Sequence, residues 1–403
     1  MVATMANNEV LISGASVAGP ALAWWLARRG FRPVIVERAG QLRGGGYAVD
    51  FRGAVHLRVL ESMGLLEQIQ ARQTHLRSLR YVDDDGRKVA SVPPVFFAGD
   101  VEILRGDLAE ILYQATRNDT EYIFGDSVTA LEQHDDGVHV TFARSAPRTF
   151  GLVIGADGVH STIRRLAFGP EEGFARDLGM FASIFTVPNF AGLDREGVLY
   201  SAPGRTAGLF ATGNDHDGAI AQLYFSAPGL DHGHDDRDTA RQQEIVAERF
   251  AGMTGWHVPR LLTEMPAAAD FYFDTTSQIH LDRWSAGRVA LVGDAACAAG
   301  PGGNGTGNAV VAAYVLAGEL AAARGDHQAA YDRYERRLRP YVEGGQKQAA
   351  GSHAFLAPAT WGKIRQRNRF FKLAPYLPIT GFINRAATRT ATAITLPDYA
   401  PAS

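Results

Sequence analysis

Short apolar segments flank an amphipathic one at the start of the chain. Residues 10–13 form an apolar run, residues 21–29 carry apolar side chains at helical spacing, and residues 33–36 form a second apolar run. Gly30 marks the end of the helix between them. Strands that are apolar on both sides and flank a helix are typical of a parallel sheet with two covered faces. The pattern therefore predicts a βαβ unit.

The pattern changes from about residue 175 to short strands separated by turn residues. Apolar-rich runs bounded by Gly, Pro and Asn cover residues 181–187, 197–200, 206–211 and 218–225. Closely spaced strands of this kind favour an antiparallel sheet. Residues 284–292, which end in a short apolar run at 289–292, return to the earlier pattern. We therefore expect the antiparallel sheet to interrupt the parallel one.

Helical patterns dominate the last quarter of the chain. Residues 309–323 and 329–338 carry apolar side chains at helical spacing, and we expect Pro340 to end the second helix. Residues 360–389 form a mostly helical region that is rich in Lys and Arg. We interpret this region as a helix with a solvated basic face that holds two domains together, in preference to a helix on a membrane surface.

Composition and charge narrow the class of protein. The chain has 403 residues, a net charge of −3 and one cysteine, Cys297. This charge gives no field that attracts nucleic acid, and no apolar run approaches the ~20 residues that cross a membrane. A single thiol forms no internal disulfide, which is typical of a reducing compartment. We expect a cytoplasmic protein with no nucleic-acid partner and no stable membrane association.

A glycine-containing turn joins the first strand to its helix. Gly14, Ser16 and Gly19 have the spacing G-x-S-x-x-G, and Glu37 ends the second strand eighteen residues after Gly19. In dinucleotide-binding βαβ units, such a turn brings a pyrophosphate to the helix N-terminus and the acid binds the ribose. The turn predicts dinucleotide binding. The alternative is an ordinary βαβ turn with a surface glutamate.

A second glycine-rich turn covers residues 293–307, Gly-Asp-Ala-Ala-Cys-Ala-Ala-Gly-Pro-Gly-Gly-Asn-Gly-Thr-Gly. Asp294 stands at a strand end, where its carboxylate can accept from a ribose or ribityl hydroxyl. The bare backbone of the glycines lets a flat ring lie against the chain. The helix that begins near Thr306 favours negative charge at its N-terminus. This turn predicts the second half of a site for a phosphorylated cofactor with a ring.

Two further positions lie between these turns. Asp157, in the sequence Gly-Ala-Asp-Gly, follows a third apolar strand at 152–155. Arg105 begins the helical pattern at 105–115, where a cation meets the positive end of the helix dipole. An anionic cofactor would account for an arginine there. The alternative is an ordinary surface arginine.

With these motifs in this order, the chain resembles the class A flavoprotein monooxygenases, the group of para-hydroxybenzoate hydroxylase, over nearly its whole length. Residues 45–50 and the following helix are similar to the compact tetracycline-inactivating members, which lack an added C-terminal domain. The resemblance implies an α/β fold with a Rossmann-type FAD-binding domain that contains the βαβ unit, an inserted, mostly antiparallel β-sheet domain for the substrate, and a C-terminal helix. The expected domains are 1–174 and 277–355 for the two parts of the FAD-binding domain, 175–276 for the sheet, and 356–403 for the C-terminal helical segment.

The resemblance also implies roles for individual residues. Those expected at FAD are Gly14, Ser16 and Gly19 at the pyrophosphate, Glu37 at the adenosine ribose, Arg38 over the adenine, Arg105 at the ribityl–pyrophosphate region, Asp157 near the cofactor, Asp294 at the ribityl chain, and Pro301, Gly303, Gly305, Thr306 and Gly307 along the isoalloxazine. Candidates near the substrate are Asp50, Arg52, Phe210, Tyr224 and Phe225, although aromatic residues at strand spacing also build cores. The motif around Asp157 is tied to NAD(P)H use in this family.

The activity that the resemblance implies is oxygenation. NAD(P)H would reduce FAD, dioxygen would give a flavin C4a-hydroperoxide, and this electrophile would attack an aromatic or enolic small molecule, such as a polyketide-like compound. The helix near Thr306 would stabilise the anionic reduced flavin. The choice between NADPH and NADH, a catalytic base, and a monomer or homodimer stay open.

Several alternatives remain at this point. Cys297 stands where the family usually has His or Tyr, and Asn304 where it has Gln, Met or Arg, which keeps an oxidase, epoxidase or reductase on the same scaffold open. Cys297 is either a reactive thiol near the flavin or a small buried apolar group. A plain NAD dehydrogenase would leave residues 293–307 unexplained. The loop 231–236 has metal-ligand residue types, but we expect a solvated loop and no metal.

Overall fold

A six-stranded sheet forms the centre of the larger half of the molecule. The computed structural model describes residues 7–42, 44–93, 96, 99–213, 218–230, 238–351, 353–376 and 388–399. The strands of this sheet follow the order β17-β18-β11-β1-β2-β7. Their bounds are β1 Glu9–Ser13, β2 Arg32–Glu37, β7 Glu121–Phe124, β11 Leu152–Gly155, β17 Ser285–Ala286 and β18 Val289–Leu291. Neighbours are parallel except for β17 and β18, so the carboxyl ends of five strands share one edge.

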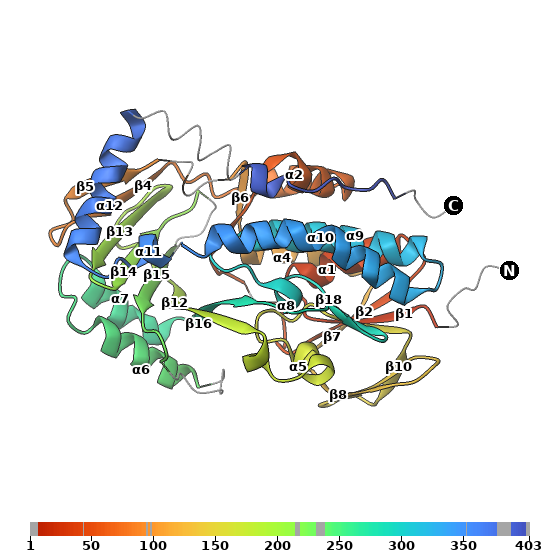
Figure 1. Cartoon of the computed structure of the whole chain (residues 1–403). Helices are drawn as coiled ribbons and strands as arrows, with labels where there is room; N and C mark the ends of the chain where they lie inside the picture. Colours follow the sequence, from red (N-terminus) through yellow and green to blue (C-terminus); the bar gives the residue numbers. More distant parts are fainter. Residues whose placement is uncertain are drawn as a thin grey trace.

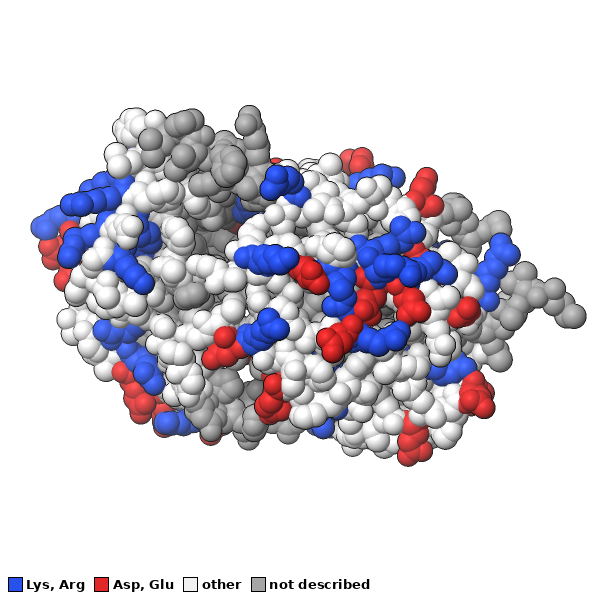
Figure 2. All heavy atoms as spheres, in the orientation of Figure 1, with Lys and Arg blue, Asp and Glu red and all other residues white. Residues whose placement is uncertain are grey.

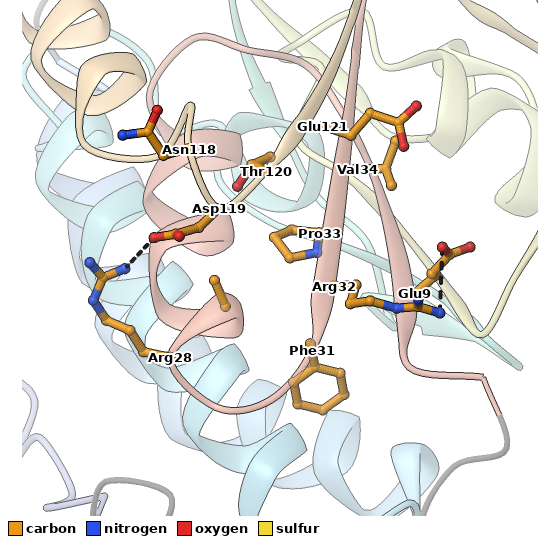
Figure 3. Close-up of a pocket in the computed structure, with 11 residues that line it drawn as sticks. Glu9, Arg28, Phe31, Arg32, Pro33, Val34, Asn118, Asp119, Thr120 and Glu121 are labelled. Atoms are coloured by element: carbon orange, nitrogen blue, oxygen red, sulfur yellow. Dashed lines mark ion pairs between the residues drawn. The ribbon is translucent and has the colours of Figure 1, made fainter.

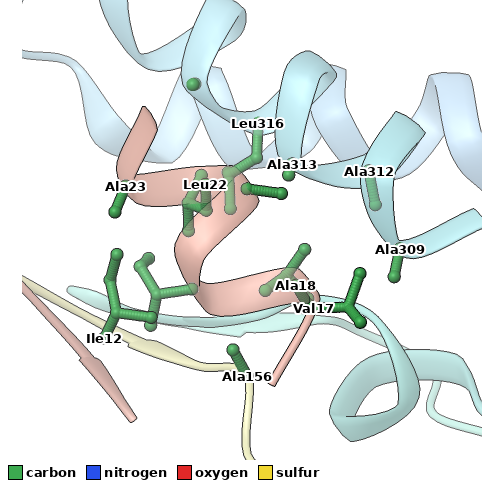
Figure 4. Packing of buried hydrophobic residues seen from close by; sticks show 14 of the residues in the cluster. Ile12, Val17, Ala18, Leu22, Ala23, Ala156, Ala309, Ala312, Ala313 and Leu316 are labelled. Atoms are coloured by element: carbon green, nitrogen blue, oxygen red, sulfur yellow. The ribbon is translucent and has the colours of Figure 1, made fainter. Parts of the chain in front are cut away.

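Helix α1 (Ala18–Ala27) packs between this sheet and helix α9 (Gly305–Ala322), as Figure 4 shows. The contact is made by small side chains on both helices, among them Ala18, Ala309 and Ala313. Small residues let the two helices lie close together over the sheet, where Ile12 of β1 and Leu22 of α1 are fully buried. Helix α10 (His327–Ala349) covers α9 on its outer side (Figure 1). The N-termini of α1 and α9 are thereby fixed near the carboxyl edge of the sheet.

Helix α10 continues through Pro340, so our prediction that this residue ends the helix is wrong. A proline inside a helix removes one backbone hydrogen bond and disfavours the preceding turn. Here the buried face continues on both sides of the proline, from Tyr334 and Leu338 to Tyr341 and Val342. The burial of this continuous face outweighs the local cost.

The remaining elements of this half surround the sheet. They are β3 Ala48–Phe51, β6 Val101–Leu104, α2 Gly53–Ser62, α3 Leu66–Ala71, α4 Arg105–Gln114, β8 Val128–Gln133, β9 Val138–Phe142, β10 Arg148–Phe150, α5 Thr162–Phe168, the 3-10 turn Glu171–Gly173 and α8 Asp294–Cys297. Strands β3 and β6 form a two-stranded ribbon, and β8 to β10 form a three-stranded sheet.

A seven-stranded sheet forms the other half, with the order β16-β12-β15-β14-β13-β4-β5. Its strands are β4 Ser78–Val82, β5 Lys88–Val92, β12 Ala175–Pro188, β13 Glu196–Ala202, β14 Arg205–Phe210, β15 Gly218–Ser226 and β16 Tyr272–Ile279. The strands expected from residue 175 onward are present. Residues 78–92 add two more, and β4 pairs in parallel with β13. The sheet is therefore assembled from two distant stretches of the chain.

Helices cover the two faces of this sheet differently. Helices α6 (Thr239–Phe250) and α7 (Val258–Glu264), with the 3-10 turn Met265–Ala267, pack on the face that buries Phe181, Leu223 and Phe225. Helix α12 (Trp361–Leu373) lies near β4 and β5 on the opposite face, where Phe371 stacks on Tyr81 (Figure 1). The C-terminal elements also include α11 His353–Leu356 and the turn Ala374–Tyr376. This mixed α/β architecture confirms the predicted fold class.

The C-terminal region contacts both halves of the molecule, but not through one helix as we expected. Helix α12 packs on the seven-stranded sheet, whereas the segment 388–399 lies on the other half. There the Tyr314 hydroxyl donates to the Pro397 carbonyl, and a Cβ on Gly318 would lie 2.2 Å from the Tyr399 ring. Two separate segments of the C-terminal region thus cover the two halves.

Charges of both signs cover the surface. In Figure 2, acidic and basic side chains lie side by side in the region of α10, where the ion pairs Arg283–Asp332 and Arg339–Glu335 are formed. Within the described ranges, no helix has the length and apolar character needed to cross a membrane. The same part of the chain contains no group of three or more His, Cys, Asp and Glu side chains that would hold a metal ion. The loop 231–236 lies outside the described residues.

A buried carboxylate, Glu319, joins α9, α10 and the C-terminal segment. Its oxygens accept hydrogen bonds from Arg333 Nε at 2.5 Å, from Arg337 Nε at 2.8 Å and from the Tyr399 hydroxyl at 2.8 Å. Burial by itself would raise the pKa of Glu319, but the three donors outweigh it and the pKa is lowered. The folded protein therefore stabilises the ionised form.

We expect Glu319→Gln to lower the free energy of unfolding by about 2 kcal/mol at neutral pH. This is less than the loss of a fully buried pair costs, because both arginines are partly solvated. Since the folded-state pKa is lowered, the contribution is complete above the unfolded pKa of about 4.3 and is lost as pH falls through the lower folded value. Urea unfolding of both proteins at a series of pH values measures this difference.

The Tyr399→Phe variant is the control for this measurement. It removes one neutral donor and should cost about 1 kcal/mol. Equal stability of wild type and Glu319→Gln at neutral pH, or a difference that grows toward acid pH, would contradict the interpretation.

Candidate functional site

The turn between β1 and α1 fits against the end of β11 so closely that two of its positions require glycine. Gly14 has a φ of 108°, and a Cβ there would lie 2.5 Å from the Ala156 carbonyl oxygen. A Cβ on Gly19 would lie 2.0 Å from the carbonyl oxygen of Gly14. No side chain fits at these distances. The glycines therefore bring the N-terminus of α1 directly above the carboxyl edge of the sheet.

The N-termini of α1 and α9 lack the side-chain caps that several other helices have. Ser161, Asp238, Asp326 and Thr360 each accept a backbone N–H at the start of α5, α6, α10 and α12. Neither α1 nor α9 has such a cap, and neither has an acidic residue in its first turn. Their first N–H groups and positive dipole ends are thus available to an anion.

Glu37 lies at the end of β2, beside the first turn, as predicted. Its two carboxylate oxygens accept from the backbone N–H groups of Ala15 and Ala39, both at 2.9 Å. These bonds fix the acid next to the Gly14 turn. Arg38 follows it on the exposed surface at the carboxyl end of β2.

Arg105 and Ser16 meet, although 89 positions separate them in the chain. The Nη1 group of Arg105 donates to Ser16 Oγ at 3.0 Å. Arg105 is the first residue of α4 and has no carboxylate in ion-pair contact within the described part of the chain. A cation at a helix N-terminus without a counter-charge is unfavourable by itself. The pair Arg105–Ser16 therefore leaves positive charge available to an anion beside the α1 N-terminus.

The Asp157 carboxylate points into the protein and joins three segments. It accepts from Ser13 Oγ at 3.3 Å, from Ser161 Oγ at 2.5 Å and from the Ile163 N–H at 3.1 Å. Burial raises the pKa of this carboxyl, and the donors oppose that shift. Asp157 thus supports the Gly14 turn from below.

Arg164 connects this network to the second glycine-rich turn. Its guanidinium is buried, donates to the Ala295 carbonyl at 3.1 Å and pairs with Glu171 at 2.5 Å. Ala295 follows Asp294 in α8. The network that starts at Asp157 therefore also fixes the position of Asp294.

Asp294 follows β18 at the carboxyl edge of the sheet. Solvent reaches its side chain, yet the surrounding protein desolvates the carboxyl enough to raise its pKa. Among the described residues, no hydrogen bond or ion pair is made by this carboxylate. Asp294 is therefore available to a ligand.

The glycines at 302–307 have two different functions in the fold. A Cβ on Gly303 would lie 2.5 Å from Ala299 Cβ, and one on Gly307 would lie 2.2 Å from the His56 ring. These two positions need glycine for packing within the protein. A Cβ on Gly302 would meet nothing within 4 Å, and one on Gly305 would lie 3.5 Å from Asp294 Oδ1. Only these two present open backbone, and Pro301 and Thr306 lie half-buried next to them.

Asn304 has a left-handed backbone, with a φ of 58°, at the position before α9. Asparagine tolerates this conformation better than most residues do. Its side chain is buried, and the neighbouring Asn308 amide donates to the Gly303 carbonyl at 3.1 Å. Asn304, which differs from the residues usual in the family at this position, therefore suits the left-handed backbone of the turn.

The seven-stranded sheet turns Tyr224 and Phe210 toward this site. Phe210 packs with Ile184 and Ile220 against Leu104 of β6, the residue before Arg105. Tyr224 shares this face with Ile220, because both lie on β15 an even number of positions apart and alternate side chains of a strand point the same way. Phe225 points to the opposite side and packs on Phe250 and Phe273. Phe225 is therefore a core residue and not a candidate for the substrate.

Asp50 and Arg52 pair with each other, at 2.5 Å from Oδ2 to Nε. Asp50 lies in β3 opposite Glu102 of β6. Burial raises the pKa of Glu102 to about 7, and the nearby charge of Asp50 adds to this shift. The structure thus places Asp50 on the ribbon and Arg52 directly after it, at the start of α2, together with an acid that the sequence analysis missed.

Two tyrosines that the sequence analysis also missed lie within electrostatic range of the site residues. The exposed fraction of Tyr47 and of Tyr272 is 38% each. The surrounding protein nevertheless desolvates both phenols and raises their pKa. Tyr47 interacts electrostatically with Arg105 and Asp294, and Tyr272 interacts with Tyr47. These interactions place the loop before β3 and the start of β16 around the same space. Strand alternation at 272–274 was the available signal.

Cys297 is a buried side chain of α8. Its thiol donates to the Gly293 carbonyl at 3.4 Å, and burial raises its pKa. A thiol with a raised pKa forms little thiolate, which is the reactive species. The structure therefore favours the reading of Cys297 as a small buried apolar group.

A hollow of about 630 Å³ lies at the opposite edge of the sheet. Glu9, Arg32 and Glu121, at the amino ends of β1, β2 and β7, border it, and the ion pairs Arg28–Asp119 and Arg32–Glu9 lie beside it (Figure 3). No residue of the predicted site lines it. Ligands of open α/β sheets bind at the carboxyl ends of the strands, so we do not assign the cofactor to this hollow.

Comparisons with known proteins decide the family. The family model described as "FAD binding domain" matches residues 7–348. The chain belongs to this family. A flavin-dependent monooxygenase from an unknown prokaryotic organism is 38% identical over 403 residues, covering 98% of this chain and 99% of the relative. An uncharacterized protein of Mycobacterium tuberculosis (strain ATCC 25618 / H37Rv) is 47% identical, over 83% of this chain and 91% of the relative.

A solved structure gives the same result. The crystal structure of the tetracycline destructase Tet(51) superimposes with a TM-score of 0.86 at 34% identity, covering 98% of this chain and all of that one (100%). The chain is a flavin-dependent monooxygenase and an oxidoreductase, and the resemblance inferred from its motifs is confirmed.

The residues of the site fit FAD. Two uncapped helix N-termini and Arg105 offer positive charge for a pyrophosphate. Asp294 offers an unpartnered carboxylate for hydroxyl groups, next to the open backbone of Gly305. The individual contacts to FAD stay predictions.

The two functions of the loop glycines predict different effects of the same substitution. Gly307→Ala should destabilise the protein by about 2 kcal/mol or more, because the new methyl group overlaps the His56 ring. Gly305→Ala should leave the apoprotein as stable as wild type, because its methyl group fits. It should nevertheless weaken FAD binding at least about tenfold, since it occupies the open backbone that we assign to the cofactor.

Thermal unfolding of the apoproteins and FAD titration separate the two effects. Wild-type FAD affinity in Gly305→Ala would show that the cofactor does not approach this position. Unchanged stability in Gly307→Ala would show that the His56 contact does not limit the packing of α9.

Proposed function

We propose that this monooxygenase uses NADPH or NADH to reduce its FAD and then inserts one atom of dioxygen into an aromatic or enolic small molecule. The observation that carries the proposal is that Tyr47 interacts electrostatically with both Arg105 and Asp294, while Leu104, the residue before Arg105, packs against the Ile184 and Ile220 face of the seven-stranded sheet. A cofactor held by these residues would have its ring next to that face.

The residues of the chain would perform three tasks in this reaction. Arg105, Ser16 and the α1 N-terminus bind the anionic part of FAD, and Asp294 orients its hydroxyl-bearing chain. The uncapped α9 N-terminus stabilises negative charge on the reduced ring. Bound FAD supplies the reaction with dioxygen that the protein alone lacks.

The seven-stranded sheet would exclude water and position the substrate. Its face toward the site presents Phe210, Tyr224 and Tyr272 next to the apolar Ile184 and Ile220. Such a mixture of aromatic and hydrogen-bonding groups suits a flat, oxygen-bearing molecule. We propose this sheet, including β4 and β5, as the substrate side of the site.

The relative Tet(51) is named a tetracycline destructase, so tetracycline is the first probe, followed by a panel of phenols and enolic ketones. FAD-loaded protein should consume NADPH or NADH faster when a substrate is present. With ¹⁸O-labelled dioxygen, mass spectrometry should find one labelled oxygen atom in the product.

The Asp294→Ala variant is the control for both measurements. We expect it to bind less FAD than wild type does. Turnover that leaves the label only in hydrogen peroxide or water would contradict oxygen insertion and indicate an oxidase. Failure of both nicotinamide cofactors to reduce the bound FAD would contradict the proposed source of electrons.

A further inference from the structure

The sheet face that borders the site carries polar groups at two separate places. In the strand register, Ile184 of β12 lies between Tyr272 of β16 and Gln222 of β15. Neighbouring strands are about 4.8 Å apart, so Tyr272 and Gln222 stand about 10 Å apart on one face. Tyr224, two residues after Gln222, shares that face. The apolar Ile184 forms the surface between the two polar places.

The hydroxyl protons of both tyrosines are already used inside the protein. The Tyr224 hydroxyl donates to Gln222 Oε1 at 2.7 Å, and the Tyr272 hydroxyl donates to Asp274 Oδ2 at 2.8 Å. Burial raises the pKa of each phenol, so both stay protonated at neutral pH. Unlike free phenols, these two tyrosines therefore have no hydroxyl proton left to donate to a ligand.

His160 keeps Asp274 an acceptor. Its two ring nitrogens lie 2.9 Å from Asp274 Oδ1 and 2.8 Å from Glu171 Oε1. Hydrogen bonds with these two carboxylates raise the pKa of His160 to about 10. At neutral pH His160 is therefore an imidazolium that donates to both acids. Asp274 accepts hydrogen bonds from both His160 and Tyr272, so the Tyr272 proton is engaged and its oxygen is left as an acceptor.

The remaining hydrogen-bonding capacity has a fixed pattern. Gln222 keeps its amide N–H groups, for which the described residues provide no acceptor. Tyr272 keeps only an acceptor oxygen. The face thus offers a donor at one place and an acceptor about 10 Å away, with an apolar surface between them.

We propose that Gln222 and Tyr272 select a flat ring system that carries a carbonyl or enolate oxygen on one side and a phenolic or enolic hydroxyl on the other. The carbonyl oxygen accepts from Gln222, which Tyr224 orients, and the hydroxyl donates to Tyr272, which Asp274 and His160 orient. The inference rests on the proposed function, because it takes this face as the substrate side of the FAD site.

Two neutral probes that differ in one methyl group test this pattern. 7-Hydroxychromone has a carbonyl and a hydroxyl on opposite sides, and 7-methoxychromone lacks only the donating proton. The dissociation constants are measured through the absorbance change of bound FAD, without turnover. Wild type should prefer the hydroxy probe by about tenfold or more, since the methoxy group leaves the Tyr272 acceptor unpaired.

The variants assign each contact separately. Tyr272→Phe should reduce the preference for the hydroxy probe to about one, because the acceptor is lost. Gln222→Leu should weaken both probes about equally, by about tenfold, and keep the preference, because the carbonyl is common to both. The Tyr200→Phe variant is a matched control, since its hydroxyl donates to Asp84 on the other face of the same sheet and should leave both constants unchanged.

The outcomes separate this inference from the proposed function. A protein that acquires no flavin spectrum with added FAD contradicts the proposed function. An FAD-loaded protein that shows no preference, keeps its preference in Tyr272→Phe, or binds neither probe overturns the assignment of Gln222 and Tyr272 and leaves the oxygenation proposal standing.

Discussion

The hydrogen bonds of one partly buried carboxylate, Asp157, connect the parts of the candidate cofactor site. Asp157 accepts from the end of β1 and from the start of α5, directly beneath the Gly14 turn. Arg164, one helical turn after the α5 cap, extends the connection to the carbonyl beside Asp294. A partly buried carboxylate needs donors to compensate for its lost hydration. The donors to Asp157, together with Arg164, therefore link the two glycine-rich turns.

This internal role explains why Asp157 differs from Asp294, although both follow a strand at the same sheet edge. Asp157 has three donors from the protein, whereas Asp294 has none in the described part of the chain. The protein satisfies one acid and leaves the other available to a ligand. An acid next to a glycine at a strand end does not by itself indicate a ligand contact, because the protein can supply its hydrogen-bond donors.

Local patterns predicted the parts of the fold that depend on neighbouring residues. The βαβ unit, the strands after residue 175 and the start of α4 at Arg105 follow from periodicity and turn residues. Tertiary contacts decided the rest. Helix α10 passes Pro340 because its buried face continues, and β4 joins β13 across more than a hundred residues. Gly307 and Gly305 have the same sequence context, but only the fold shows that His56 lies against one of them.

Local patterns likewise pointed to some residues of the candidate site and not to others. The sequence pointed to Ser16, Arg105 and Asp294 as candidates, because each breaks or completes a local rule at a helix or strand end. It did not point to Tyr272 or Gln222, whose proposed function depends on which face of a strand meets the other half of the molecule. The faces of β15 and β16 became known only from the strand register and the packing of Phe225 on α6.

The dissociation constant of FAD in the Ser161→Ala variant tests this account most directly. Ser161 gives its proton to Asp157 and caps α5, so its loss should cost only about 1 kcal/mol of stability. If the Asp157 network positions both glycine-rich turns, FAD should bind at least about fivefold more weakly to the folded variant. A folded Ser161→Ala protein that binds FAD as tightly as wild type would contradict the central claim.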